Sequence, residues 1–434
     1  MFRRRSRRAV RIVPLLLTAL LLASCALPGS GGDRPVTLTY WSWTSGSQEL
    51  ADRFNATHDH IRVTFEKVPA GTAGGYSKMF NAVKAGKAPD VVAVEYPQLP
   101  GFVTQQVLQP LDPYGVTDLG DQYPDWAWRH VALGGQVYGL PMNIGPTVMF
   151  YRTDLFAEYG LTPPTTWEEF RTTAETVAAE HPGVTLTNFG TNDAALLAGL
   201  AWQAGSRWFD SGSGHWQVDA TDEAGARFAG YWESLIDDGL VTARPTFAEQ
   251  HVTQLQQGTS LTVLAAPWTA ANIQRFAPDL AGRWGAAPLP AWPEGPASGN
   301  YGGSALAVPH GADHPEEAME FIRWVSTSPD AVEAVAQVNT SYPANTTLTD
   351  HWGAAIEAAN PYVAGMDLPA AAETAARTVN PAWEWGPDMT EGFARLVDEA
   401  TAWVGRPEGI RTALARWQDA TVDQLRQRGF TVPE

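Results

Sequence analysis

The sequence predicts an α/β fold with more than one domain. From residue 36 onward, segments with the apolar periodicity of strands alternate with segments that have the periodicity of helices, as in sheets covered by helices. At 434 residues the chain is too long for one ordinary hydrophobic core, which predicts two or three domains. Hydrophobic residues make up 44% of the chain and charged residues 18%, which is typical of a globular protein.

The first five elements support this prediction most directly. A strand, a helix, a strand, a helix and a strand are expected over residues 36–40, 48–57, 61–68, 76–86 and 90–95. The last of them is a continuous apolar run, which is typical of a strand buried on both faces. Ligands of such sheets bind beyond the carboxyl ends of the strands, so the residues that follow the first and third strands are expected at a ligand site.

The middle of the chain contains two strand-like runs over residues 137–156, interrupted at Asn143, Gly145 and Pro146. A helix is expected to begin after Thr166, with Glu169 completing a capping box. The remaining predicted elements are a mainly helical region over 194–258, strands over 261–268, 284–290 and 302–309, and helices from residue 316 onward.

The N-terminus is typical of a secretory signal over residues 1–24. Arginines precede an apolar run, Ile12 to Leu22, and small residues follow it. The run is too short to span a bilayer, which takes about 20 residues. Leu22–Cys25 resembles the bacterial lipobox, which predicts lipidation of Cys25, and residues 25–35 are then the lipidated cysteine and a flexible tether. Cys25 is the single cysteine, so no disulfide can form within the chain.

Charge and motif content argue against several classes of function. The chain has 47 Asp and Glu against 29 Lys and Arg, a net charge of −18, which disfavours nucleic acid as a partner. There is no G-x-S-x-G or G-x-G-x-x-G motif, and residues 71–78 fail the P-loop spacing, so no cofactor is expected. The histidines at 58–60 and 310–314 lie in polar segments without nearby cysteine, so no metal site is expected.

Four segments in order, residues 90–112, 138–170, 258–273 and 302–336, together with the lipobox, resemble the family 1 extracellular solute-binding proteins. These are the sugar-capturing lipoproteins of bacterial ABC importers. The resemblance implies a two-lobed, periplasmic-binding-protein-like fold of type II, with three hinge crossings and a ligand cleft between the lobes. Closure of such lobes around a ligand is a known hinge motion.

Carried onto this chain, the resemblance places the crossings near residues 143–146, 284–286 and 326–330. Lobe 1 would combine residues 36–144 and 286–325, and lobe 2 would combine residues 146–285 and 330–434. The implied function is that of a carbohydrate-binding lipoprotein, with an oligosaccharide as the expected ligand, which delivers its sugar to the permease subunits of an ABC transporter. We expect a monomer without enzymatic activity, held by its lipid anchor alone on the extracytoplasmic face of the cell membrane.

A sugar offers C–H faces to aromatic rings and hydroxyls to carboxylates, amides and backbone groups. The chain has 18 Trp, more than a core of this size needs. The predicted ligand-binding residues are Trp43, Ser45, Gln48, Glu95, Asn143, Trp268, Tyr301, Gly302, Gly303, Trp383 and Trp385.

Each candidate has a structural alternative. In "YWSW", strand alternation favours Tyr40 as core and Trp43 as a ligand contact and leaves Trp41 open. Trp268 falls where the resembled family places a stacking tryptophan, and Trp202 is expected in the core. Glu95 could equally be a solvated surface acid. Asn143 could be a turn residue, and the two glycines could belong to a β-bulge. Of Trp383 and Trp385, which flank Glu384, at least one is expected to face the ligand.

Two rival functions remain at this point. A secreted glycoside hydrolase would also line a sugar cleft with aromatic and acidic residues. A binding protein of the same fold for a polyamine or peptide would suit the acidic composition, because a cation could sit among aromatic rings and carboxylates. The ordered series of family segments and the lipobox favour the sugar-binding protein.

Overall fold

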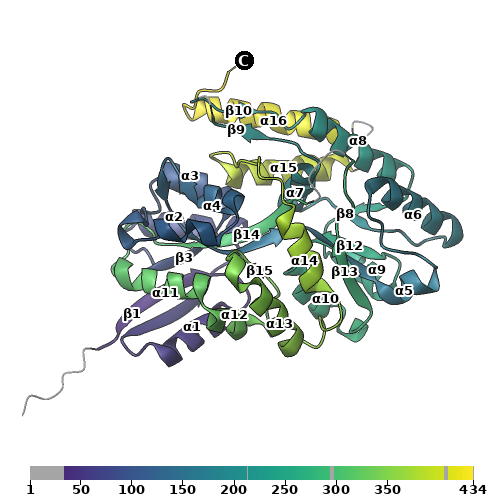
Figure 1. The fold of residues 1–434 in the computed structure, drawn as a ribbon. Coiled ribbons are helices and arrows are strands. Elements are labelled where there is room, and N and C mark those ends of the chain that lie inside the picture. The colour runs from purple at the N-terminus through teal and green to yellow at the C-terminus, as the bar shows by residue number, and fades with distance from the viewer. Residues whose placement is uncertain (1–33, 213, 294–297, 405–408, 434) are drawn as a thin grey trace, which may run out of the picture. The chain divides into compact units, whose positions relative to one another are not determined.

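The larger sheet contains six strands among the described residues, in the order β15–β6–β14–β3–β1–β2 (Figure 1). Their bounds are β1 Val36–Ser42, β2 Ile61–Lys67, β3 Val91–Glu95, β6 Leu140–Pro146, β14 Asn300–Ala307 and β15 Tyr342–Pro343. Strand β1 is parallel to β2 and β3, whereas β14 is antiparallel to β3 and β6. Helices α1 (Ser47–Thr57) and α2 (Gly75–Lys84) join the first three strands, which confirms the predicted alternation.

The computed structural model describes residues 34–212, 214–293, 298–404 and 409–433. The predicted signal peptide, Cys25 and nearly all of the tether lie outside the described residues. From Pro35 onward the chain forms one compact unit. Within the described residues, no helix has both the length and the apolar character needed to cross a membrane.

A second sheet has the strand order β12–β7–β13, and all of its pairs are antiparallel. Its strands are β7 Val148–Arg152, β12 Thr262–Ala265 and β13 Trp284–Pro288. Three short strand pairs complete the described strands, besides isolated bridges. They are β4 Ala132–Leu133 with β5 Gln136–Val137, β8 Asn188–Gly190 with β11 Thr242–Arg244, and β9 Phe209–Asp210 with β10 Gln217–Val218. The fold is therefore the predicted α/β fold with two main sheets.

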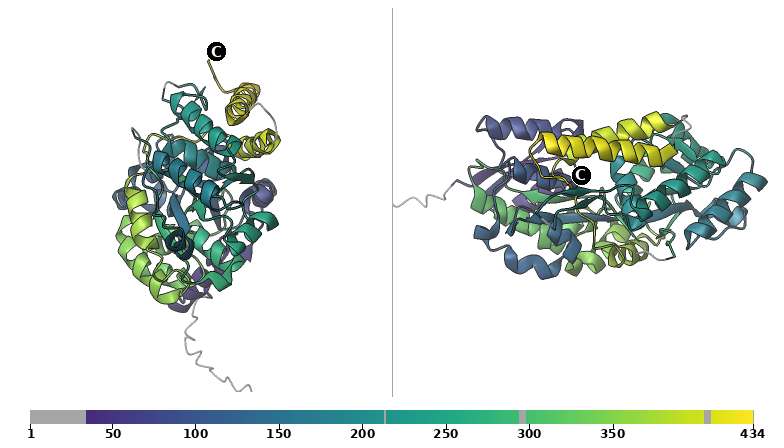
Figure 2. Two further views of the ribbon diagram at one scale, coloured as in Figure 1. Left: turned by 90° about the vertical axis from the view of Figure 1, so that its right-hand side faces the viewer. Right: turned by 90° about the horizontal axis from the view of Figure 1, so that it is seen from above.

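The remaining helices are α3 Leu99–Thr104, α4 Asp125–Val131, α5 Thr153–Glu158, α6 Trp167–Glu180, α7 Ala194–Gln203, α8 Glu223–Asp237, α9 Glu249–Gln257, α10 Thr269–Phe276, α11 Pro315–Thr327, α12 Pro329–Val335, α13 Thr349–Ala359, α14 Leu368–Arg377, α15 Met389–Trp403 and α16 Gly409–Gln427. Helices α15 and α16 run side by side, and α16 also packs against α8 (Figure 2). Helices α1, α11 and α12 pack against one another, and α11 also contacts β1 (Figure 1).

The chain passes between the two sheets beside the predicted crossing at residues 143–146, and again after β13, which contains the predicted crossing at 284–286. Strand β6 of the larger sheet and β7 of the smaller sheet are separated by Thr147 alone, and β13 of the smaller sheet is followed by β14 of the larger one. Further along, α12 packs against α1 and β15 pairs with β6. These contacts favour a third crossing after Pro343 rather than near residues 326–330. The lobe boundaries themselves stay predictions.

Helix α6 begins where the sequence predicts. The Thr166 side chain accepts a hydrogen bond from the Glu169 backbone N–H at 3.1 Å. The Glu169 carboxylate differs from the expected capping box, because it accepts from the N–H of Thr165 at 2.7 Å and from the Thr165 hydroxyl. This contact satisfies a donor one residue earlier than the N-cap.

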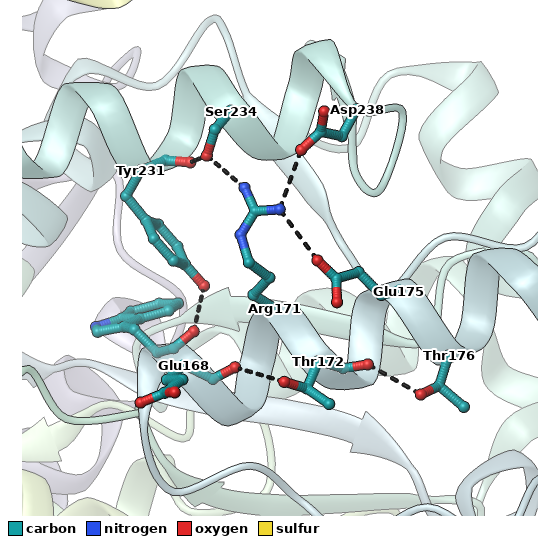
Figure 3. Close-up of polar contacts among 9 residues, drawn as sticks. Glu168, Arg171, Thr172, Glu175, Thr176, Tyr231, Ser234 and Asp238 are labelled. Atoms are coloured by element: carbon teal, nitrogen blue, oxygen red, sulfur yellow. Dashed lines mark hydrogen bonds and ion pairs between the residues drawn. The ribbon is translucent and has the colours of Figure 1, made fainter.

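A polar network around Arg171 joins α6 to α8 (Figure 3). The guanidinium donates to Ser234 and lies 3.0 Å from the Asp238 carboxylate and 3.2 Å from that of Glu175. Beside it, the Tyr231 hydroxyl donates to the Trp167 carbonyl at 2.7 Å. Several partners thus fix one planar group between two helices, which favours a defined packing of α8.

Replacement of Arg171 by glutamine is expected to lower the free energy of unfolding by about 1 kcal/mol, because the network is only partly buried. Chemical denaturation measures this loss. Arg377→Gln is the control, since Arg377 pairs with Glu373 along the exposed side of α14. Equal losses in the two variants would contradict a stabilising role for the α6–α8 network.

Candidate functional site

A cavity of about 790 Å³ lies beside strands of the larger sheet, and its wall includes α10, the helix that follows β12 of the smaller sheet. Its walls come from the segment after β1, the end of β3, the middle of β6, the N-termini of α7 and α10, strand β14, residues 338–341 and helix α15. Eight of the predicted ligand-binding residues line it: Trp43, Ser45, Glu95, Asn143, Trp268, Tyr301, Gly302 and Gly303. The structure therefore brings together residues that lie as far apart in sequence as positions 43 and 303.

The two ends of "YWSW" have the environments that strand alternation predicts. Tyr40 is fully buried in the core, and Trp43 is partly exposed at the cavity. The Trp43 ring meets Tyr76 edge to face, with 5.6 Å between ring centroids. Trp41, which the sequence left open, does not line the cavity and instead lies under the ammonium group of Lys78, 4.1 Å from the ring centroid.

Trp268 and Tyr301 form the aromatic wall contributed by α10 and β14. Their ring centroids are 4.8 Å apart with a tilt of 54°. The Trp268 indole N–H donates to the Tyr301 carbonyl at 3.4 Å, which fixes the ring at the start of α10 while leaving part of it exposed. A partly exposed, braced indole can stack on a ligand without first losing conformational freedom.

The glycines of β14 have a backbone role in addition to their place at the cavity. Gly302 and Gly303 adopt φ values of +73° and +88°, and the register of β14 with β6 shifts between Asn300 and Gly303. The β-bulge considered as the alternative is therefore present. On the facing strand, a Cβ on Gly145 would lie 1.9 Å from the Tyr301 carbonyl oxygen. Backbone meets backbone at this point, and a side chain would not fit.

Of the carboxyl groups at the cavity, those of Glu95 and Asp193 are each held by a tyrosine. The Tyr76 hydroxyl donates to Glu95 at 2.7 Å, and the Tyr301 hydroxyl donates to Asp193. Burial raises the pKa of both Glu95 and Asp193, and the charge of Asp193 adds to the rise at Glu95. Glu95 is therefore a cavity residue and not a solvated surface acid.

Asn143 lies in β6 and is mostly buried. Its side-chain oxygen accepts a hydrogen bond from the Ser304 N–H at 2.9 Å, and its backbone carbonyl accepts one from the Tyr96 hydroxyl at 3.0 Å. The amide oxygen is thus engaged in joining β6 to β14. The Nδ2 group of the same amide is the one that can donate to a ligand.

Gln48 does not lie at the cavity. Helix α1 buries Ser47, Leu50 and Phe54, and Gln48 lies off this face, where it donates to Asp52 at 2.9 Å. The neighbouring Ser45 does line the cavity, and its carbonyl accepts a hydrogen bond from Asn339 at 2.7 Å. Gln48 therefore lies away from the site at which the sequence predicts it.

Trp383 and Trp385, of which at least one was expected to face the ligand, both lie away from the cavity in this structure. Both rings are at least 95% buried, and neither lines the cavity. Trp383 stacks on Trp202 with 5.2 Å between ring centroids and 7° between planes, and Trp385 meets Trp202 edge to face. The Trp202 indole donates to the Asn380 carbonyl at 2.6 Å, so this loop is part of a buried tryptophan cluster. Trp202 is in the core, as predicted.

Several cavity residues escaped sequence analysis. They are Thr44, Asn192, Asp193, Ala194, Ala195, Ala271, Asn272, Ser304, Val338, Asn339, Ser341, Thr390, Glu391, Phe393, Ala394, Val397 and Asp398. Asp193 carried a usable signal, because it precedes an apolar helix and caps it through the Leu196 N–H at 3.0 Å. The residues of α15 form one helical face with spacings of three and four, which a core-facing helix shows equally.

Within the part of the chain that the structure describes, no group of three or more His, Cys, Asp or Glu side chains is placed to hold a metal ion. The cavity combines aromatic faces, amides, hydroxyls and carboxylates. That combination can bind a polyhydroxylated ligand by stacking and hydrogen bonding.

Comparisons with known proteins agree with this geometry. The model of the family described as bacterial extracellular solute-binding protein matches residues 40–332. The arabinooligosaccharide-binding protein of Bacillus subtilis (strain 168) is 25% identical over 331 residues, 73% of this chain and 75% of that protein. The lactose-binding protein of Rhizobium radiobacter is 26% identical over 336 residues, with the same coverage of 73% and 75%.

Solved structures share the fold over almost the whole chain. The galacto-N-biose/lacto-N-biose I-binding protein of the ABC transporter from Bifidobacterium longum, in complex with lacto-N-biose, has a TM-score of 0.80 and 26% identity, covering 92% of this chain and 99% of that one. The ABC transporter associated binding protein from B. animalis subsp. lactis Bl-04, in complex with β-1,6-galactobiose, also has a TM-score of 0.80, with 24% identity and coverage of 92% and 100%. The two-lobed solute-binding fold is thereby established.

Proposed function

Because the chain belongs to the family of bacterial extracellular solute-binding proteins, we propose that its cavity binds an oligosaccharide for delivery to the permease of an ABC importer. The observation that carries this proposal is the cavity itself. Rings of Trp43, Trp268 and Tyr301 lie there beside the carboxyl groups of Glu95 and Asp193. Its volume of about 790 Å³ is within the usual range for small-molecule sites.

The named relatives support a saccharide as the ligand class. An arabinooligosaccharide-binding protein, a lactose-binding protein and a maltodextrin-binding protein are among them. The Bifidobacterium longum protein of the same fold was solved with lacto-N-biose. These relatives bind different sugars, so they support the class of ligand and leave its linkage to experiment.

The mechanism we propose is reversible capture. The ligand enters between the lobes, its C–H faces stack on Trp268 and Trp43, and its hydroxyls donate to Glu95 and Asp193 and accept from Asn143. Closure of the lobes around the sugar then presents the loaded form to the permease. Lipidation of Cys25 would hold a monomeric protein, without enzymatic activity, on the extracytoplasmic face of the membrane.

A thermal-shift screen tests the proposal. The panel contains lactose, maltose, β-1,6-galactobiose and an arabinobiose, with spermidine and a mixed tripeptide as non-sugar ligands. A bound ligand raises the melting temperature by mass action, so at least one disaccharide is expected to do so. A shift with spermidine or the peptide alone would overturn the proposal. Sustained release of monosaccharide from a bound disaccharide would instead indicate a glycoside hydrolase.

Saccharide affinity is expected to fall on acidification. Hydrogen bonds from ligand hydroxyls to Glu95 and Asp193 are stronger when these carboxyl groups are ionised, so binding lowers their pKa and releases protons. Burial raises both pKa values in the free protein, so affinity is greatest above them and declines as the pH falls through them, at a higher pH than for ordinary carboxyls. Calorimetry from about pH 8 to about pH 4, a range that reaches the ordinary pKa of carboxyl groups, measures this decline.

Glu95→Gln removes one of the two titrating groups and keeps an acceptor for Tyr76. A shallower pH dependence is therefore expected in this variant. Affinity that is independent of pH in the unmodified protein would show that neither carboxylate contacts the ligand.

A further inference from the structure

The charged side chains that line the cavity are all acidic. Four acidic residues line it, Glu95, Asp193, Glu391 and Asp398, and its described lining contains no lysine, arginine or histidine. Glu391 is paired outside the lining with Arg395, four residues along α15, at 3.2 Å. Three carboxyl groups are therefore left at the cavity without a basic partner among the described contacts.

The contacts of the two inner carboxyls show the same imbalance. Glu95 and Asp193 are each held by a tyrosine hydroxyl, which is a neutral donor. Their pKa values are shifted by burial and by hydrogen bonds from hydroxyl and backbone N–H groups, and that of Glu95 also by the charge of Asp193. No cation is among these causes. The protein thus concentrates negative charge in a partly desolvated space, where charge interactions are stronger than in water.

Helix N-termini are the other usual source of positive potential, and two reach this cavity, those of α10 and α7. At α10 the Thr269 and Ala270 N–H groups already donate to the Ala266 and Pro267 carbonyls, and α7 offers the second. Asp193 already occupies it, because its Oδ1 accepts from the Leu196 N–H at 3.0 Å. The donor that could otherwise hold an anion there is engaged by the protein's own carboxylate. An acidic ligand would therefore meet like charges at the inner end of α7 as well.

We propose that the cavity selects saccharides that carry no acidic group, and that Glu95, Asp193 and Asp398 make this selection. The inference rests on the proposed function and adds the charge class of the ligand. Neutral sugars donate hydroxyls to the carboxylates, amine-bearing sugars also supply a compensating charge, and uronic or phosphorylated sugars are repelled.

The test compares three forms of one disaccharide that differ at a single position. Lactose, its derivative with a carboxylic acid at C6 of galactose, and its derivative with an amine at the same carbon are titrated into the protein by calorimetry. Maltose and β-1,6-galactobiose, each with the acid or the amine at C6 of its non-reducing residue, extend the series. The acidic form is expected to bind at least about tenfold more weakly than the neutral form, and the amine form at least as tightly as the neutral form.

Salt and two matched variants identify the cause. High salt is expected to reduce the difference in affinity between the neutral and acidic forms of the sugar, because salt screens the partly exposed charges of the cavity. Asp398→Asn removes an exposed charge from the cavity and is expected to reduce the ratio of the two affinities about threefold. Glu316→Gln, an exposed acid at the start of α11 outside the cavity lining, is expected to leave it unchanged.

Three outcomes would overturn the inference. Equal affinity for neutral and acidic forms would show that the carboxylates do not select. An equal loss of affinity for the acidic and the amine derivatives would show that a substituent at C6 is excluded by its size and not by its charge. Failure of every neutral disaccharide to bind would refute the proposed function, and the inference with it. The first two outcomes leave the proposed function intact.

Discussion

Trp383→Ala is expected to lower the free energy of unfolding by about 3–5 kcal/mol, the usual loss when a buried large aromatic side chain is truncated. The ring is 2% exposed and stacks on Trp202 with only 7° between planes. It also touches Trp208 and Trp385, so its removal leaves a void bordered by three other tryptophans. Chemical denaturation monitored by tryptophan fluorescence measures the loss.

The same variant decides between the two roles considered for this loop. If Trp383 is a core residue, the molecules that remain folded should bind saccharide with unchanged affinity. Trp383→Phe keeps a ring and removes an indole N–H that has no partner among the described residues, so its loss of stability should be much smaller. Unchanged stability of Trp383→Ala with lost binding would show that the ring faces the ligand.

Trp268→Ala is expected to weaken saccharide binding by about 1–3 kcal/mol while the fold stays intact. The indole is partly exposed, so its truncation removes a stacking surface at the cavity and leaves no closed void. It also frees the Tyr301 carbonyl, whose bond to the indole is long at 3.4 Å and contributes little to stability. Calorimetry with the disaccharide that gives the largest thermal shift measures the change.

Trp128→Ala serves as the control for this loss. Trp128 is also partly exposed and stacks on a tyrosine, Tyr123, but it does not line the cavity. Its replacement should change affinity little. Unchanged affinity of Trp268→Ala, or an equal effect of Trp128→Ala, would remove Trp268 from the binding site.

The local sequence pattern was sufficient to predict a residue's environment where that environment follows from the residue's place in a strand. Alternation along β1 predicted that Tyr40 is buried and Trp43 is not, and the buried run of β3 placed Glu95 at its carboxyl end. Strand ends meet at one edge of a sheet, so these predictions needed no knowledge of distant packing. The structure confirms them, and Trp43 and Glu95 both belong to the wall of the cavity.

Sequence reasoning failed where the environment depends on which elements meet. A tryptophan beside an acidic residue is equally compatible with a sugar site and with a buried cluster, and stacking on Trp202 from α7 places Trp383 in the cluster. The cavity face of α15 went unnoticed because a helix face that points to a ligand has the same spacing as one that points to a core. Gln48 was misplaced by the rotation of α1, whose buried face starts one residue earlier.

The close approach at Gly145 bears on how specificity can change in this protein. The close approach of β6 and β14 there is made by backbone atoms, and Trp43 and Asp398 take no part in it, whereas the Asn143 side chain also joins the two strands. Ligand preference and strand geometry are therefore separable traits. Positions such as Trp43 and Asp398 can be randomised in a library to recognise new sugars, provided that Gly145 is retained.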